Sequence, residues 1–358
     1  MIVPESLKKI SPGRPITGFY VSHRRKAAAF FALGTVLFAI SGCQSGPENC
    51  EISRIGPLPV LNSSHSPVVQ VTLNGKPVAM IVDTGADASL VSTATSEKFD
   101  LSYTGGHVTL RGTTGVVAAS VVRADKLGLG KAIASDVLFI EIDKKWGHIG
   151  DLPVAGLLGS DFLSNYEVKF DLPQHLITLY RMQGCSSKDI VWKKPVDPVP
   201  LEPGDGKDVL VPFKINGKPI DAILDSGASG TVIRPSQARK AGVTRDMLAR
   251  DPVGFSRGVS DDKVVSHRHL FDTVEVGPEI FHNVHLQVAP LETDSALLGA
   301  DFLRHAVVWL SYRDRILYIE RPQKRDAPGN MTDNVAGNMT TGSPATEPGS
   351  TAVHALAN

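Results

Sequence analysis

The chain contains an internal repeat, and this repeat constrains its fold more than any other feature. The second copy begins 142 residues after the first: residues 74–86 read NGKPVAMIVDTGA and residues 216–228 read NGKPIDAILDSGA. Each copy is followed by a second shared segment, LLGSDFL at 157–163 and LLGADFL at 297–303. Each half therefore carries one Asp-Thr-Gly or Asp-Ser-Gly. A site with two carboxylates on a pseudo-two-fold axis requires a duplication of this kind.

Length and composition indicate a two-domain, all-β protein. A chain of 358 residues is long enough for two domains of ordinary size. Its 37 basic and 37 acidic side chains cancel, which argues against a nucleic-acid partner, because such domains normally carry a basic excess. Aromatic residues make up only 6%, while 33 Gly and 24 Pro residues suit short strands joined by many turns.

The local pattern within each repeat predicts a β-hairpin that leads into the Asp. Residues 68–73 alternate as a strand does, Asn74-Gly75 is a strong turn signal, and residues 78–82 form a second strand. The second copy repeats this arrangement at 209–215, 216–217 and 220–224. Further hairpins are expected around 105–106, 128–130 and 277–278, and short helices within 161–164 and 236–249.

Composition also divides the chain into segments. We expect a signal peptide at 1–42, a polar tether at 43–64, an N-terminal lobe at 65–181, a linker at 182–207 and a C-terminal lobe at 208–322. The last segment, 323–358, contains almost no large apolar residues. It cannot bury enough surface to fold and is expected to be disordered.

The N-terminus resembles a bacterial lipoprotein signal. Arg24-Arg25-Lys26 precede an uncharged run at 27–41, which is short for a membrane span but suits a signal-peptide core. The run ends in Ile-Ser-Gly-Cys, which predicts cleavage before Cys43 and lipidation of its thiol. By analogy, Gln44 directly after this Cys favours delivery to the outer membrane. A plain signal peptide and an uncleaved anchor are the alternatives.

Two further cysteines, Cys50 and Cys185, remain. An exported protein permits a disulfide, and this one would close a long loop worth roughly 4–5 kcal/mol in the chain-entropy view. Two free thiols are the alternative.

The motifs together resemble those of the retropepsin-like aspartic peptidases, whose superfamily also includes pepsin. The signature is two hydrophobic residues, Asp-Thr/Ser-Gly-Ala, and later two hydrophobic residues and Gly. It occurs at 81–86 with 157–159 and again at 223–228 with 297–299. The resemblance covers about residues 65–322. It implies two homologous β-barrel lobes in an intramolecular pseudo-dimer, with Asp83 and Asp225 as the catalytic pair.

The resemblance also assigns supporting roles, and it requires no metal or cofactor. Two carboxylates about 3 Å apart share a proton, since like charges that close cannot both ionise. Residues of the two Asp loops support the pair: hydroxyls that bond across the axis, glycines that permit a tight turn, and the alanines that follow (Thr84, Gly85, Ala86, Ser226, Gly227, Ala228). A downstream segment is expected to thread behind each loop (Leu158, Gly159, Leu298, Gly299).

Two segments between these motifs are candidates for the flaps that cover the cleft. They contain Thr113, Thr114 and Gly115 in the first half, and Gly258 and Val259 in the second. Ordinary surface hairpins are the alternative, and no Tyr occupies the first segment as in pepsin-like enzymes. The acidic residues near the motifs are expected to be structural (Asp87, Asp161, Asp301), and four histidines are expected to be solvated rather than metal ligands (His267, His269, His282, His285).

The sequence therefore predicts a lipid-anchored, periplasm-facing aspartic endopeptidase. We expect it to act as a monomeric pseudo-dimer on extended peptide or protein substrates of the envelope, bound by strand addition. Two alternatives remain open. One is a peptide-binding module without turnover, and the other is pairing of each lobe with a lobe of another chain.

Overall fold

The computed structural model describes residues 50–112, 115–204, 208–257, 263–321 and 356–357. The expected signal peptide, the lipidation site at Cys43 and most of the C-terminal tail lie outside these residues. Among the residues described, no helix is long and apolar enough to cross a membrane.

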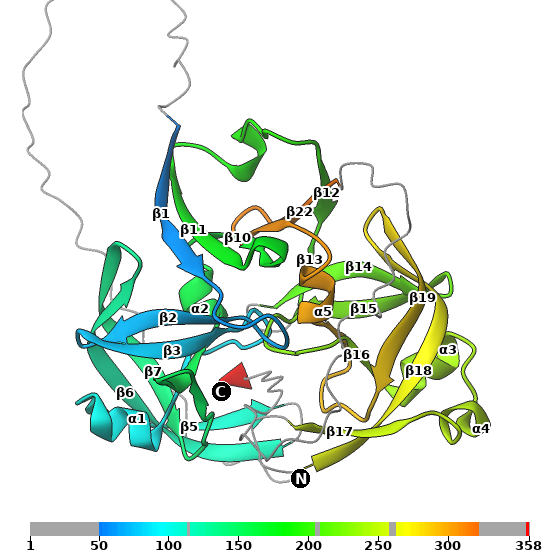
Figure 1. The fold of residues 1–358 in the computed structure, drawn as a ribbon, viewed down its shortest axis with the longest axis horizontal. Helices are drawn as coiled ribbons and strands as arrows, with labels where there is room; N and C mark the ends of the chain where they lie inside the picture. Colours follow the sequence, from blue (N-terminus) through cyan, green and yellow to red (C-terminus); the bar gives the residue numbers. More distant parts are fainter. Residues whose placement is uncertain (1–49, 113–114, 205–207, 258–262, 322–355, 358) are drawn as a thin grey trace, which may run out of the picture. The chain divides into compact units, whose positions relative to one another are not determined.

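The first lobe is a closed β-barrel of six strands (Figure 1). The strands follow one another around the barrel as β2 (Val68–Leu73), β3 (Lys76–Val82), β9 (Leu152–Leu158), β4 (Leu90–Ser92), β7 (Ala132–Ile142) and β6 (Gly115–Leu129). Pairing of β2 with β6 closes the ring. The smaller elements are α1 (Thr93–Lys98), β5 (Ser102–Gly112), β8 (His148–Ile149), α2 (Ser160–Leu163) and β23 (Leu356–Ala357), which pairs with β5.

The second lobe repeats this barrel. Its strands are β14 (Val209–Ile215), β15 (Lys218–Leu224), β20 (Ala296–Leu298), β16 (Val232–Ile233), β19 (Glu279–Val288) and β18 (Lys263–Val276). Antiparallel pairing of β14 with β18 closes this second barrel. The remaining elements are β13 (Glu202–Pro203), α3 (Pro235–Lys240), α4 (Arg245–Leu248), β17 (Val253–Arg257) and α5 (Ala300–Leu303). The all-β, two-barrel fold expected from the repeat is therefore confirmed.

A six-stranded sheet joins the two lobes. Its order is β1 (Glu51–Pro59), β11 (Leu176–Gln183), β10 (Glu167–Asp171), β21 (Val308–Ser311), β22 (Ile316–Glu320) and β12 (Val196–Pro200). Short 3-10 helices, η1 (Leu172–Gln174) and η2 (Ser187–Asp189), accompany it. The central pair is β10 with β21, one from each lobe, so backbone hydrogen bonds run continuously across the lobe boundary. One face of this inter-lobe sheet contributes to an apolar core that both lobes share.

Two segments expected to be a tether and a linker contain strands of this sheet. Residues 51–59 form β1 instead of a tether, and the 182–207 segment contains η2, β12 and β13. Both β1 and β12 are edge strands, and an edge strand tolerates Pro because one side of its backbone needs no partner. Their Pro residues made them look like connecting segments, yet Leu58 and Val199 are buried in the shared core.

The disulfide that the sequence left open is present in the structure. β1 pairs antiparallel with β11, and Glu51 lies opposite Gln183. This register brings the preceding Cys50 near Cys185, and the two Cα atoms are 5.0 Å apart. The cross-link therefore joins the start of the inter-lobe sheet to the segment that follows β11.

The predicted turns are correct with one exception. In both Asn-Gly turns the two residues have positive φ (Asn74 47°, Gly75 82°), as a two-residue hairpin requires. The hairpins at 128–130 and 277–278 also form, between β6 and β7 and between β18 and β19. The expected hairpin at 105–106 is wrong. These glycines lie inside β5, where the register with β6 shifts between Tyr103 and His107.

Candidate active site

Each Asp of the repeat lies directly after a buried barrel strand. Asp83 follows β3 and Asp225 follows β15, and each of these strands pairs in parallel with the downstream strand of its own lobe. The Asp83 N–H donates to the Leu158 carbonyl at 3.0 Å, and the Asp225 N–H donates to the Leu298 carbonyl at 2.9 Å. The downstream leucines therefore fix the point at which each Asp leaves its strand.

The two carboxyl groups meet at the boundary between the lobes. Asp83 and Asp225 are both 0% exposed. A Cβ atom built on Gly227 would lie 2.2 Å from the Asp83 Cγ, and one built on Gly85 would lie 2.5 Å from the Asp225 Cγ. Each glycine thus lies against the carboxyl group of the opposite lobe and leaves no room for a side chain. Neither glycine has a positive φ, so close approach rather than an unusual backbone turn requires glycine here.

The pair is electrostatically coupled. Burial raises the pKa of Asp83 well above its usual range, and the neighbouring charge of Asp225 raises it further. Backbone N–H groups of Gly85 and Ala86 act in the opposite direction but do not outweigh burial. One of these N–H groups, that of Gly85, lies 3.0 Å from the Asp83 Oδ1. In the second lobe the Ala228 N–H donates to the Asp225 Oδ1 at 2.9 Å. The arrangement favours one proton held on the pair.

The hydroxyls beside the carboxylates bond reciprocally across the lobe boundary. The Thr84 hydroxyl donates to the Leu224 carbonyl at 2.5 Å and accepts the Ser226 N–H at 3.0 Å. The Ser226 hydroxyl donates to the Val82 carbonyl at 2.7 Å and accepts the Thr84 N–H at 3.0 Å. Four buried hydrogen bonds therefore lock the two Asp loops to each other, in the arrangement that the family resemblance implied.

The downstream glycines let a second chain segment cross behind each loop. A Cβ atom on Gly159 would lie 2.7 Å from the Ala88 backbone, and one on Gly299 would lie 2.5 Å from the Gly230 backbone. The residues that follow these glycines donate their N–H groups to the carbonyls of Ala86, at 2.7 Å, and Ala228, at 2.8 Å. Each Asp loop is thus supported from behind by its own lobe.

A half-buried Asp completes this support in each lobe, a structural role of the kind expected for Asp161 and Asp301, although the sequence did not indicate their partners. Asp161 accepts both the Ser89 N–H (3.0 Å) and the Ser89 hydroxyl (2.7 Å). Asp301 accepts the same two groups from Thr231, each at 2.8 Å. Burial raises the pKa of Asp301, and the Thr231 hydrogen bonds partly oppose it. The repeated Asp-Phe-Leu after each downstream glycine was the available signal for these two aspartates.

Two antiparallel strand pairs flank the flap candidates in the sequence. Strands β5 and β6 form one pair and β17 and β18 form the other. Gly115 opens β6 opposite Gly112, whereas Thr113, Thr114, Gly258 and Val259 lie outside the described residues.

The histidines lie on β18 and β19. The expectation that they are solvated is wrong for His269, which is buried and hydrogen-bonds Asp251 through its Nδ1 at 2.6 Å. Burial lowers the pKa of His285. The described part of the chain contains no group of three or more His, Cys, Asp or Glu side chains arranged to hold a metal ion.

Comparison with known proteins matches both halves to protease families. The family described as "Aspartyl protease" matches residues 69–162, and the family described as "gag-polyprotein putative aspartyl protease" matches residues 211–305. DNA damage-inducible protein 1 of Saccharomyces cerevisiae is 27% identical over 112 residues, which are 31% of this chain. The matched region spans only 25% of that relative's length. The chain therefore carries two retropepsin-like aspartyl protease domains in tandem, one in each half.

Proposed function

We propose that the protein is an aspartic endopeptidase whose catalytic dyad is Asp83 and Asp225. The observation that carries this proposal is the direct approach of two fully buried carboxyl groups, each fixed by its own lobe. A buried pair that shares a proton supplies both an acid and a base at one point. Neither copy of the motif has lost its Asp, which supports turnover over a binding role alone.

The proposed mechanism needs no covalent intermediate. The ionised carboxylate removes a proton from a water molecule held between the two groups, and that water attacks the scissile carbonyl carbon. The protonated carboxyl donates its proton to the carbonyl oxygen, so the tetrahedral intermediate carries no oxyanion. The carboxyl that took the proton from water then transfers it to the leaving nitrogen, and the C–N bond breaks. A hydroxyl proton of the intermediate passes to the other carboxylate, which restores the singly protonated dyad.

A single chain suffices for this site in our proposal. The reciprocal bonds of Thr84 and Ser226 and the inter-lobe sheet join the two halves within one polypeptide. The alternative, in which lobes pair between chains, predicts that activity and molecular mass change together on dilution. Size-exclusion chromatography with light scattering and an activity assay on each fraction separates the two, and we expect activity in the monomer peak.

For the substrate, we propose extended peptide segments of envelope proteins. β17 is an edge strand, and β5 pairs on its outer side with β23 only at Leu110 and Arg111. An extended peptide can add to a free strand edge of this kind. Digestion of a peptide library by the purified protein, beside an Asp83→Asn control, tests turnover and reads out specificity. A module that only binds peptides would retain the library without cleaving it.

We also propose an envelope location through a lipid on Cys43, with outer-membrane delivery. A Cys43→Ser variant should leave the membrane fraction and retain peptidase activity in soluble extracts, since the lipid chains contribute the anchor and little else. Tight membrane association of the variant would instead indicate an uncleaved anchor at 27–41.

We propose a mildly acidic pH optimum, about pH 5–6. The pKa of Asp83 is raised, so the dyad keeps its proton at pH values at which an ordinary carboxyl group is already ionised. Pepsin-type loops usually place a hydroxyl after the Gly, whereas here Ala86 and Ala228 occupy that position and are buried. In Ala86→Ser the new hydroxyl should stabilise the ionised carboxylate and move the optimum to lower pH. A wild-type optimum near pH 2–3 would contradict this account.

A further inference from the structure

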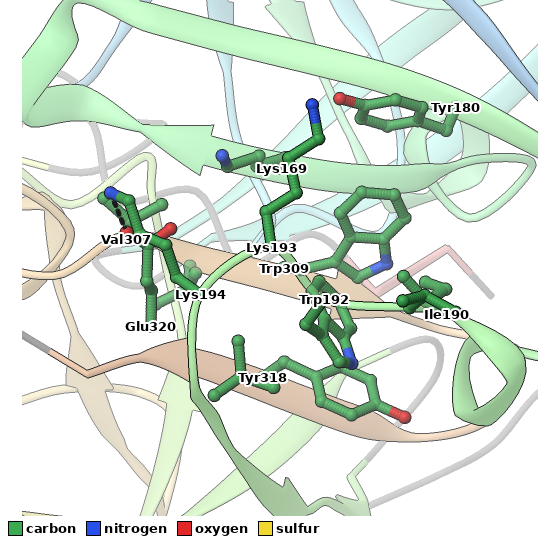
Figure 2. A pocket seen from close by; sticks show the side chains of 13 residues that line it. Lys169, Tyr180, Ile190, Trp192, Lys193, Lys194, Val307, Trp309, Tyr318 and Glu320 are labelled. Atoms are coloured by element: carbon green, nitrogen blue, oxygen red, sulfur yellow. Dashed lines mark hydrogen bonds and ion pairs between the residues drawn. The ribbon is translucent and has the colours of Figure 1, made fainter.

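A cavity of about 310 Å³ lies against the inter-lobe sheet and is lined by neither aspartate of the dyad (Figure 2). Side chains alternate between the two faces of a strand. Val168 and Phe170 enter the shared core, so Lys169 between them points to the opposite face, and Trp309 does so beside the core residue Leu310. The cavity therefore opens on the face that the shared core does not cover. It is lined by Lys169, Tyr180, Trp192, Lys193, Trp309 and Tyr318, among others.

The aromatic rings of this pocket hold one another in place. Trp309 stacks on Tyr180 with ring centroids 4.5 Å apart, and Trp192 meets Trp309 edge-on at 5.4 Å. Trp192 also packs against Tyr318 at 4.7 Å. The Trp309 indole N–H donates to the buried Glu167 at 2.9 Å, and the Tyr318 hydroxyl lies 3.1 Å from the Ser187 hydroxyl. The polar ends of the buried Trp309 and Tyr318 are thus satisfied away from the cavity, and the half-exposed rings of Tyr180 and Trp192 pack on them.

The segment that carries Trp192 is attached on both sides. On its N-terminal side, the Cys50–Cys185 disulfide and a 2.5 Å hydrogen bond from the Ser187 N–H to Asp314 fix η2. On its C-terminal side, Lys194 pairs with Glu320, and the Arg321 N–H donates to the Pro195 carbonyl. The segment that carries Trp192 and forms one wall of the cavity is therefore held in place at both of its ends.

The charged groups at the cavity leave a positive excess. Lys194 is neutralised by Glu320, and the Lys169 ammonium lies 3.7 Å from Asp171. Lys193 is exposed and makes no ion pair with any described residue. In Figure 2 the Lys169 and Lys193 side chains extend to the same side of the tryptophans as Tyr180.

The charged groups that line the cavity favour one class of ligand over another. Ammonium groups only donate hydrogen bonds, and the one carboxylate of the lining, that of Glu320, is engaged by Lys194. A sugar ring presents hydroxyls that need both donors and acceptors, whereas a carboxylate accepts only. A pocket with an apolar aromatic body and ammonium groups at one side suits a ligand with an apolar group next to a carboxylate.

We propose that this pocket binds the C-terminal end of a peptide whose last side chain is apolar. The side chain packs against the half-exposed rings of Tyr180 and Trp192, and the terminal carboxylate lies at Lys193 beside Lys169. The site is separate from the dyad, so binding does not depend on turnover. The protein would hold a peptide end on the inter-lobe sheet whether or not the proposed peptidase function is correct.

The test uses the full chain carrying Asp83→Asn and Asp225→Asn, so that no peptide is cleaved. The probes are acetyl-Ala-Ala-Leu-Phe with a free carboxylate and the same peptide as its C-terminal amide. Titration is followed by calorimetry and by tryptophan fluorescence, because two of the chain's three Trp residues line the cavity. The third, Trp146, is 2% exposed in a separate core, and a Trp146→Phe variant removes its background signal. The free acid should bind saturably and the amide about tenfold more weakly, the difference expected for one charge-assisted hydrogen bond.

Variants assign the contacts. Lys193→Gln should weaken the free acid about tenfold and leave the amide unchanged, while Trp192→Ala should weaken both peptides. Lys188→Gln, an exposed change in η2 outside the lining, is the matched control and should have no effect. Equal affinity for acid and amide, an equal effect of Lys188→Gln and Lys193→Gln, absence of saturable binding, or tighter binding of an N-acetylglucosamine oligomer than of the peptide would each overturn the proposal.

Discussion

Removal of one hydroxyl from the reciprocal bonds between the lobes should destabilise the protein and impair the dyad. The change is Thr84→Val, which keeps the shape of the side chain but removes its oxygen. Thr84 is fully buried, and its hydroxyl both donates to the Leu224 carbonyl and accepts the Ser226 N–H. The variant therefore leaves one buried carbonyl and one buried N–H without their partner.

The magnitude follows from those two groups. A buried donor or acceptor left unsatisfied costs about 1–3 kcal/mol, so the expected loss in the free energy of unfolding is about 4 kcal/mol. The entropy of unfolding is about 2.1 cal/mol/K per residue, so in a chain of 358 residues a loss of about 4 kcal/mol corresponds to a fall in Tm of about 5–7 °C. A displacement of the adjacent Asp83 should also lower kcat/KM by at least about tenfold, since catalysis is sensitive to sub-ångström placement.

Calorimetric melting and peptide hydrolysis measure both effects. Thr72→Val is the matched control, because Thr72 is half-buried in β2 and its hydroxyl bonds to no described residue. Ser226→Ala should give a similar loss, and the double variant should be less than additive because the two side chains share one network. The reasoning would be refuted by a Thr84→Val protein that has the same Tm as Thr72→Val and hydrolyses peptides at the wild-type rate.

Three further predictions concern the same framework. Gly227→Ala should abolish activity and lower the free energy of unfolding by about 1–3 kcal/mol, because the added methyl would lie 2.2 Å from the Asp83 Cγ. Measurements of kcat/KM and of thermal melting test this, and near-wild-type activity would contradict the close approach. Replacing Cys50 and Cys185 by Ser should lower stability by about 4–5 kcal/mol in denaturant titrations, since the cross-link spans 135 residues, and wild-type stability would argue against the bridge. The pKa of Asp83 is raised on folding, so its contribution to stability is present below about pH 4 and is lost as pH rises through the folded pKa. Asp83→Asn should therefore melt above the wild type at pH 7 and lose this advantage towards pH 4, and a constant difference would exclude the raised pKa.

The dyad and its support could be predicted because the relevant signals are local and occur twice. The Asp after a buried strand, the adjacent hydroxyl and the downstream Leu-Gly each lie within a few residues of a repeated motif. Their partners across the boundary followed from the symmetry of the repeat, as the bonds between Thr84 and Ser226 illustrate. The reason for Gly85 and Gly227 was not visible, because contact with the opposite carboxyl depends on how the lobes dock.

Features that arise between the repeats could not be predicted in the same way. Strands β1 and β12 are each hydrogen-bonded to a neighbouring strand on one side only, so they can contain Pro. Their composition therefore matched that of connecting segments. The Cys50–Cys185 pairing follows from the register of β1 on β11, which no local signal specifies. The aromatic pocket combines Trp192 with Trp309, which come from different parts of the chain, so the repeat gave no indication of it.

The central claim is that both carboxylates of one chain form the catalytic dyad. The most direct measurement is kcat/KM for a cleavable peptide in wild-type protein, Asp83→Asn, Asp225→Asn and the double variant, with folding checked by melting. The shared-proton mechanism uses both groups, so each single variant should lose activity as completely as the double variant. Near-wild-type turnover in either folded single variant would contradict the account.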